Sequence, residues 1–297
     1  MRFFKLLSAF LALQLISFAV WKVGFSEIAP DQVPAVDPNY VHSALELASA
    51  SITQASADES VVITETPVQK AEPLPVIELP HFSAKNDTGS EAQLTRSIHE
   101  NQIAEVLKHL PAEHAAALRE VTLDYDPAAH RGLGGGSLII MRAVDMSAEE
   151  FLAVFVHELG HNVDYAFLAP LSQNQTSPFT DAGTPLFESD PSLDFYRISW
   201  TSNQYSQEGA VAADFVSGYA MTDPFEDFAE SYVYYVLHNR EFKSLAENSE
   251  ALKAKYDFMK ERVFNGEVFE TGDANLHQTT QPWDITVLPY DLNQFLG

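Results

Sequence analysis

The sequence predicts a domain of the α+β class, in which a small mixed sheet is combined with separate helices. Apolar residues recur at helical spacing over residues 96–110, 147–165 and 223–238. Two shorter runs, at residues 121–125 and 137–141, have the apolar and β-branched composition of strands. The N-terminal third of the chain shows neither periodicity, which indicates a disordered leader ahead of the folded domain.

The composition excludes several classes of partner. A length of 297 residues allows one or two domains, and 46% hydrophobic residues with 20 Phe are enough for a sizeable core. Acidic residues outnumber basic ones by 42 to 17, which gives a net charge of −25. Such a chain repels nucleic acid and anionic membrane surfaces. The lack of cysteine excludes disulfides and thiolate metal ligands.

Residues 1–22 have the pattern of an export signal. Arg2 and Lys5 form a positive start, and an apolar run follows from Leu6 to Trp21. That run is short for a membrane span, but an uncleaved N-terminal membrane anchor is an alternative to a cleaved signal peptide. In both cases we expect the rest of the chain outside the cytoplasm: periplasmic, secreted or anchored facing outward.

Residues 23–92 have the composition of a linker. They are rich in Pro, Ala, Ser and Glu and lack sustained periodicity. We expect an extended tether, which is either a spacer that holds a domain away from the membrane or a leader without a specific role. The domain itself is predicted over residues 93–265, and residues 266–297 form a C-terminal tail to which we assign no role.

A glycine-rich stretch, Arg131-Gly-Leu-Gly-Gly-Gly136, leads into the second predicted strand. It is not a phosphate-binding loop, because the Lys-Ser/Thr pair is missing and no helix follows at once. Glycine permits the close approach of another backbone. We therefore expect a sheet edge to which a peptide substrate adds as a strand, or alternatively a flexible turn. The candidate substrate contacts are Gly134, Gly135, Gly136 and Ser137.

The most specific pattern in the chain is H-E-x-x-H, formed by His157, Glu158 and His161. Ser147 and Glu150 fit the capping box of a helix that carries it. Residues four apart lie on one face of a helix, so the two imidazoles can bind one zinc ion while Glu158 reaches its water. Two packed core histidines are the alternative, but burying these polar groups requires a compensating partner.

The chain after this motif offers one further polar candidate and a long loop. Asp164 follows His161 by three residues, so it is a candidate to fix the tautomer of a ligand histidine, or else a solvated residue at a helix end. Residues 170–216 contain four prolines. They are predicted to form a long loop that makes one wall of the cleft.

A second helix offers the remaining ligand. Asp223 fits its N-cap, with proline at the first helical position. Glu226 and Glu230 are four apart on one face, so one can complete a zinc site while the other supports a ligand histidine. Favourable charge near a helix N-terminus is the alternative for both. Tyr219 lies in the loop before this helix, where its phenol can donate to a developing oxyanion.

These motifs resemble a known family. His157-Glu-Leu-Gly-His-Asn-Val-Asp164, together with Tyr219-x6-Glu226-Asp-Phe-Ala-Glu230, is similar to the catalytic domain of anthrax lethal factor and its relatives, including the bacterial Pro-Pro endopeptidases. The resemblance covers residues 95–265 and implies a zincin-type domain of the gluzincin class. The segment between the two motifs is longer than the family pattern leads us to expect, so the proline preference is not carried over.

The resemblance also implies a role for each matched residue. The zinc ligands are His157, His161 and Glu226, with one Zn²⁺ per chain. The general base is Glu158 and the oxyanion donor is Tyr219, while the matching position of Glu230 places it behind the ligands.

We therefore expect an exported metalloendopeptidase that hydrolyses peptide bonds of a peptide or protein with a zinc-activated water and a glutamate base. Two alternatives come from other classes: a zinc-binding domain without peptidase turnover, and a zinc amidase that acts on a non-peptide or cell-wall bond. A glutamate base and a tyrosine donor argue against a purely structural zinc, but they are equally suited to either kind of amide.

Overall fold

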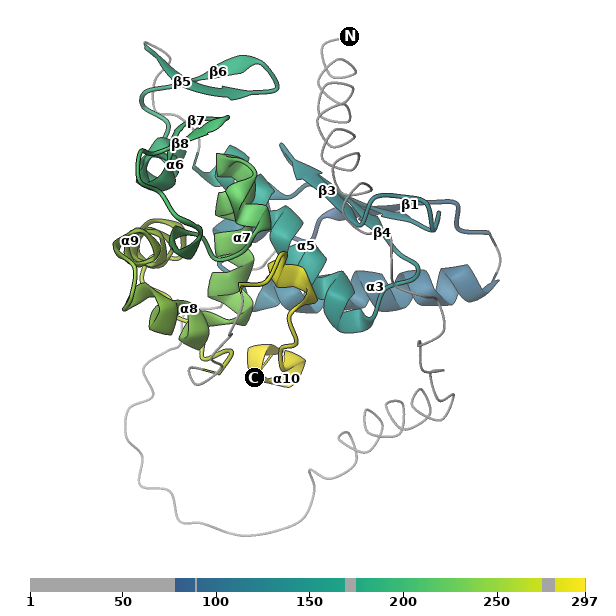
Figure 1. Ribbon diagram of the computed structural model, residues 1–297. Coiled ribbons are helices and arrows are strands. Elements are labelled where there is room, and N and C mark those ends of the chain that lie inside the picture. Colours follow the sequence, from purple (N-terminus) through teal and green to yellow (C-terminus); the bar gives the residue numbers. More distant parts are fainter. Residues whose placement is uncertain (1–77, 89, 169–174, 274–280, 297) are drawn as a thin grey trace, which may run out of the picture. The chain divides into compact units, whose positions relative to one another are not determined.

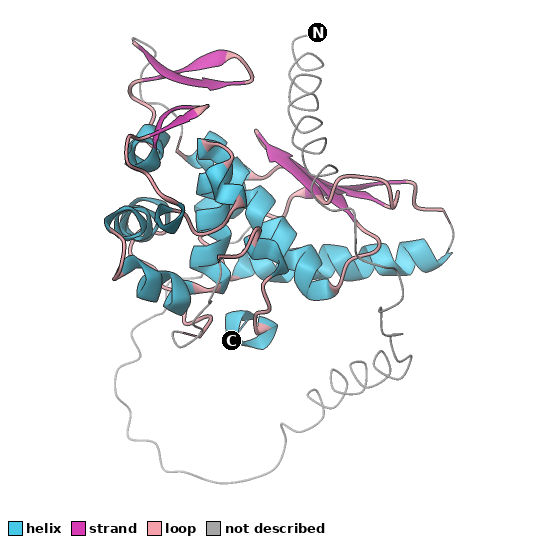
Figure 2. Cartoon of the chain, in the orientation of Figure 1, coloured by secondary structure: helices cyan, strands magenta, loops and turns pink. Residues whose placement is uncertain are grey.

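The computed structural model describes residues 78–88, 90–168, 175–273 and 281–296 (Figure 1). The chain divides into two units, residues 1–74 and 75–297, and the described residues all belong to the second. That unit is a mixed α/β fold with small sheets (Figure 2). The predicted export segment lies outside the described residues, and none of the described helices is long and apolar enough to cross a membrane.

The principal sheet has four strands in the order β1–β2–β4–β3. Strands β1 (His81–Lys85), β2 (Glu120–Asp124) and β4 (Leu138–Arg142) run parallel, while β3 (Gly132–Gly135) pairs antiparallel with β4. The sheet is therefore mixed, and β3 is one of its edges. The predicted glycine-rich turn is thus itself a strand, and the tight turn to β4 consists of the two residues after it.

Strand β1 lies within the segment that the sequence predicts to be linker. It pairs with β2 along its whole length, from His81 opposite Glu120 to Lys85 opposite Asp124. The predicted boundary at residue 92 is therefore wrong, and the domain begins earlier in the chain. Five residues with only partial burial have too weak a hydrophobic alternation to reveal a strand that depends on a partner distant in the sequence.

Two helices at the centre of the fold start at the predicted caps. Helix α5 (Ala148–Asn162) begins after Ser147, whose hydroxyl accepts from the amide of Glu150 at 3.1 Å. Helix α7 (Pro224–Leu237) begins after Asp223, whose carboxylate accepts from the backbone amides of Phe225 and Glu226. Helix α3 (Ser90–Lys108) and helix α4 (Ala112–Ala117) precede β2, and the π-helical turn η1 (Val163–Phe167) extends α5.

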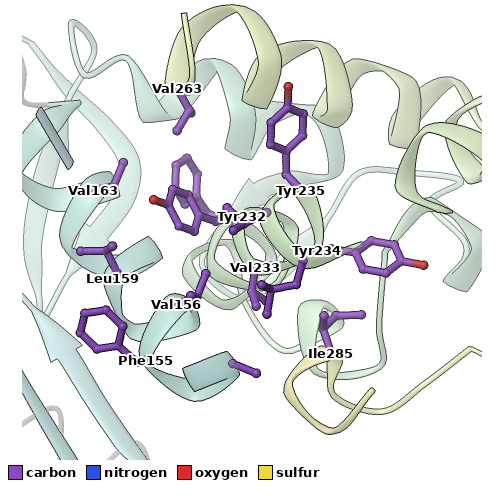
Figure 3. Packing of buried hydrophobic residues seen from close by; sticks show 14 of the residues in the cluster. Phe155, Val156, Leu159, Val163, Tyr232, Val233, Tyr234, Tyr235, Val263 and Ile285 are labelled. Atoms are coloured by element: carbon purple, nitrogen blue, oxygen red, sulfur yellow. The ribbon is translucent and has the colours of Figure 1, made fainter. Parts of the chain in front are cut away.

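Helices α5 and α7 pack side by side, and their apolar side chains form the centre of the core (Figure 3). Gly160 of α5 lies at the contact. A Cβ at this position would be 3.1 Å from Cα of Ala229 and 3.1 Å from Cβ of Tyr232, both on α7. A residue without a side chain therefore allows the two backbones to approach closely. This approach places the first turns of α7 beside the H-E-x-x-H turn of α5.

The long loop predicted over residues 170–216 is largely structured where it is described. It contains the hairpin β5 (Thr176–Asp181) and β6 (Thr184–Phe187), helix α6 (Ser192–Ser199), and the hairpin β7 (Trp200–Ser202) and β8 (Tyr205–Ser206). The aromatic side chains of α6 and of the start of β7 are buried, so they anchor this region to the core. Short elements separated by prolines have too few residues to show a periodic pattern.

The C-terminal part of the chain, including the predicted tail, belongs to the domain. Helices α8 (Asn239–Ala246) and α9 (Glu250–Phe258) and the π-helical turn η4 (Met259–Val263) complete the helical part. The chain then returns to the core through the 3-10 turn η5 (Ile285–Val287) and helix α10 (Leu292–Leu296). Ile285 is 1% exposed and Phe295 is 6% exposed, so the predicted domain end at residue 265 is wrong.

We expect Gly160→Ala to lower the free energy of unfolding by about 1 kcal/mol. Overpacking a core costs about 1–3 kcal/mol, and the neighbours here are backbone and Cβ atoms that cannot rotate away. This cost exceeds the gain of about 1 kcal/mol that alanine brings to an ordinary helix interior. Urea unfolding of the two proteins measures the difference, and a more stable variant would contradict the close packing described here.

Candidate metal centre

Three donor atoms from α5 and α7 come together beside the close helix contact. Glu226 Oε2 lies 3.2 Å from Nε2 of His157 and 3.4 Å from Nε2 of His161. One ligand atom from each of the three residues lies within 4.8 Å of the others. Of the two glutamates that the helix pattern left open, Glu226 is thus the one that faces both imidazole Nε2 atoms.

The hydrogen bond on the far side of His157 decides which ring nitrogen faces Glu226. Nδ1 of His157 is 2.9 Å from Oε1 of Glu230, and a carboxylate can only accept, so we assign the ring proton to Nδ1. The Nε2 of a neutral His157 then presents a lone pair to Glu226 Oε2. That oxygen has no hydrogen-bond partner among the described residues, although it is buried. The Nε2 lone pair and the Glu226 oxygen are both acceptors, so in a buried site they require a cation or a proton between them.

The charges of the site are strongly coupled. Burial opposes a charge on His157, but contact with Glu226 and Glu230 outweighs it and holds the pKa of His157 well above its ordinary value. Burial opposes the charge on Glu226 as well, yet the two histidines hold its pKa well below the ordinary value. The two imidazoles and the Glu226 carboxylate therefore attract a positive charge. In the absence of a metal, this charge is carried by a proton. Metal and proton compete for the same nitrogens.

The chemistry of this donor set fits zinc. Two imidazole nitrogens and one carboxylate oxygen are the ligands of a catalytic zinc site, which keeps a further position open. The orphaned oxygen of Glu226 points at the place where the two Nε2 atoms converge, as a metal ligand would. Glu226 Oε2 has no hydrogen bond to give up among the described residues, so the three side chains fit the ion as they stand.

Glu230 lies behind His157 and is fully buried. Its Oε1 accepts from Nδ1 of His157, and its Oε2 accepts from the hydroxyl of Ser217 at 2.6 Å and from the amide of Ile285 at 2.9 Å. A buried carboxylate needs such donors, because the desolvation of its charge is otherwise costly. Of the two glutamates, Glu230 is therefore the one that contacts Nδ1 of His157.

Glu158 is directed at the edge strand. A Cβ on Gly132 would lie 2.3 Å from Oε1 of Glu158, and a Cβ on Gly134 would lie 2.4 Å from its carbonyl oxygen. Both strand positions must therefore be glycine for Glu158 to lie where it does. Burial raises the pKa of Glu158, although the neighbouring histidines oppose this change. A carboxylate with a raised pKa is better suited to accept a proton and release it again.

Tyr219 lies beside Glu226 and His157, in the 3-10 turn η3 (Tyr219–Met221). Its hydroxyl donates to Oε1 of Glu226 at 3.0 Å, and its ring stacks on that of His157 with a centroid distance of 6.0 Å. Burial, followed by the charges of Glu226 and Glu158, holds the pKa of Tyr219 well above its ordinary value. The phenol therefore keeps its proton and can act as a hydrogen-bond donor.

The four predicted substrate contacts divide into two pairs. Gly134 and Gly135 belong to the edge strand β3, and Gly134 touches Glu158. Gly136 and Ser137 form the turn to β4, where their carbonyl groups are already used. Gly136 O accepts from the side-chain amide of Asn162, and Ser137 O accepts from the backbone amides of Arg119 and Glu120, at the start of β2. Gly134 thus lies beside Glu158, whereas the carbonyls of the second pair serve the fold.

The prediction for Asp164 is wrong. Its carboxylate is buried and accepts a short hydrogen bond from the hydroxyl of Tyr196. No described hydrogen bond joins it to either ligand histidine, and the residue that does contact His157 is Glu230. Position 164 falls in the π-helical turn η1, which rotates the side chain relative to a regular helix and directs it toward α6.

Three contributors to the site were not predicted. They are Gly132, which makes room for Glu158, and Ser217 and Ile285, which bind Glu230. A serine two residues before Tyr219 is a weak signal in the sequence. The contribution of Ile285 comes from its backbone amide, which no side-chain pattern can reveal.

Comparison of the chain with protein-family models, with curated proteins and with solved structures gave no match. The resemblance to the lethal factor family therefore rests on the two motifs quoted above.

We expect Glu226→Ala to weaken zinc binding more than Glu230→Ala. Loss of one of about four ligands removes roughly a quarter of the binding free energy, which is a factor of about 100 to 1,000 or more. Loss of a supporting carboxylate weakens binding by about 10- to 100-fold. Competition with a chelator measures both affinities, and circular dichroism checks that both variants are folded. The opposite order would identify Glu230 as the ligand.

Proposed function

We propose that this chain is a zinc-dependent endopeptidase. One observation carries the proposal: a buried Glu226 oxygen without a hydrogen-bond partner faces the Nε2 atoms of both H-E-x-x-H histidines. The glutamate of the same motif, Glu158, lies against the edge strand of the sheet. A purely structural zinc site would need neither a glutamate that does not bind the metal, such as Glu158, nor an adjacent tyrosine.

The residues of the chain have separate tasks in this reaction. His157, His161 and Glu226 hold the metal, which when bound acts as a Lewis acid and lowers the pKa of water. Glu158 takes a proton from the attacking water and delivers it to the leaving amine. Tyr219 keeps its proton, and its hydroxyl turns from Oε1 of Glu226 to donate to the oxyanion that develops at the scissile carbonyl.

The edge strand supports a peptide as the substrate. Among the described residues, β3 has a neighbouring strand on one side only, so its outer backbone groups are available to pair with an extended chain. Gly132 and Gly134 of this strand contact Glu158, so a chain paired with β3 would run past the general base. A Cβ on Gly135 would have no other atom within 4 Å, so the strand is open to a close approach at this residue.

Export is part of the proposal but rests on the N-terminal sequence pattern. A signal peptide or anchor at residues 1–22 would place the enzyme in the periplasm, outside the cell, or on the outer side of the membrane. Its substrates would then be extracytoplasmic peptides or proteins.

We expect Glu158→Gln to retain zinc and to lose turnover by a factor of about 100 to 10,000, the usual contribution of a general base. The full chain with one equivalent of zinc is incubated with a diverse peptide library, and mass spectrometry reads the products. Glu149→Gln, an exposed glutamate on the same helix, is the matched control and should cut as the unmodified protein does.

Each outcome of the library experiment is informative. Cuts by the unmodified protein and by Glu149→Gln alone support an endopeptidase, and the flanking residues define its specificity. Cuts that persist in Glu158→Gln would overturn the assignment of the base. If zinc binds but no peptide is cut, the proposal fails in favour of an amidase of non-peptide bonds, which purified cell wall would test, or of a binding role.

A further inference from the structure

The chain returns to the metal centre near its C-terminus. Residues 281–286, called here the C-terminal strap, run beside the turn that carries Tyr219. The amide of Gly218 donates to the carbonyl of Pro282 at 2.9 Å, and the amide of Tyr219 donates to the carbonyl of Trp283 at 2.6 Å. These two backbone hydrogen bonds tie the turn of the oxyanion donor to the strap.

The strap also contacts Glu230, the carboxylate that binds His157. The amide of Ile285 donates to Oε2 of Glu230 at 2.9 Å, while Oε1 of the same carboxylate is 2.9 Å from Nδ1 of His157. Both Glu230 and Ile285 are buried, so this hydrogen bond is shielded from bulk solvent. One carboxylate thus links a backbone amide of the strap to the imidazole of His157.

A third contact anchors the strap to the edge strand. Arg131, which directly precedes β3, donates to Oδ2 of Asp284 at 2.6 Å and to the hydroxyl of Thr286 at 2.5 Å. The same guanidinium lies 3.0 Å from Glu150 in the first turn of α5. The strap therefore contacts the elements that carry Glu158, Glu230 and Tyr219.

We propose that the C-terminal strap positions the active site, with the amide of Ile285 as the group that orients Glu230 and, through it, His157. The strap is a positioning element, because it acts through these side chains and not on the substrate. Orientation of the metal site does not depend on the proposed peptidase activity; only the effect on turnover rests on that function.

The hydrogen bond can be removed without changing the path of the chain. Ile285 is the first residue of the 3-10 turn η5, where the fixed φ of proline fits and its missing N–H breaks no helical hydrogen bond. Asp284 before it has φ −144° and ψ 130°, the extended conformation that a residue before proline prefers. Ile285→Pro therefore deletes the donor to Glu230. Ile285→Ala, the matched control, keeps this donor and loses at least as much side chain.

Three readouts on the full chain test the proposal. In the metal-free protein, the exchange-protected Nδ1–H resonance of His157 should persist in Ile285→Ala and be lost in Ile285→Pro. Zinc affinity by chelator competition should fall about 10- to 100-fold in Ile285→Pro and less than about threefold in Ile285→Ala. Turnover of the peptide substrate should show the same order. Equal effects of the two variants, or none in either, would overturn the proposal.

Arg131→Gln provides an independent test that leaves Ile285 and Glu230 unchanged. Removal of a positive charge near the site strengthens cation binding if the arginine acts only through its field. If it acts by holding the strap, zinc affinity falls instead, by about 10-fold or more. Arg119→Gln, an exposed arginine before β2, is the control. Tighter or unchanged zinc binding in Arg131→Gln would contradict the strap, even if Ile285→Pro failed to fold.

The outcomes for the strap and for the proposed function can be distinguished. If no peptide is cut by the unmodified protein, but the His157 resonance and zinc affinity depend on the Ile285 amide, the peptidase function fails and the strap is supported. If peptides are cut and both Ile285 variants behave alike, the function is supported and the strap fails.

Discussion

The structure depends on how closely helices α5 and α7 approach each other at Gly160. The two helices carry all three donors of the candidate metal centre, and their separation decides whether Glu226 faces the histidines. A larger residue at this position would push α7 away at Ala229 and Tyr232, on either side of Glu230. The glycine inside the H-E-x-x-H motif thus serves the contact between the helices, while the polar residues around it face the site.

Burial of charge is the second constraint, and it explains why distant segments of the chain meet here. Glu226 and Glu230 are carboxylates in the interior of the domain, and each needs positive charge or hydrogen-bond donors. Glu230 obtains donors from the loop before α7 and from the C-terminal segment. Glu226 Oε2 obtains none from the described residues, which distinguishes an oxygen that is available to a metal from one that supports a ligand.

The sheet contributes through its edge. β3 consists largely of glycine, so Glu158 can lie against its backbone without a clash. The same strand is held from behind by β4 and from its start by Arg131. Glu158, the strand edge and the three candidate metal ligands are therefore fixed relative to one another by elements that also form the core. Few of the groups involved depend on exposed loops for their position.

The sequence alone determined the elements whose signals are local. The caps at Ser147 and Asp223, the two central helices, the spacing of His157 and His161, and the spacing of Glu226 and Glu230 all follow from patterns within one or two turns of a helix. Only the tertiary structure decided which glutamate faces the histidines, that Asp164 turns away toward Tyr196, and that β1 and the C-terminal strap belong to the domain. These features depend on contacts between residues far apart in the chain, and several are made by backbone groups that every residue possesses. A pattern of side chains therefore cannot reveal them.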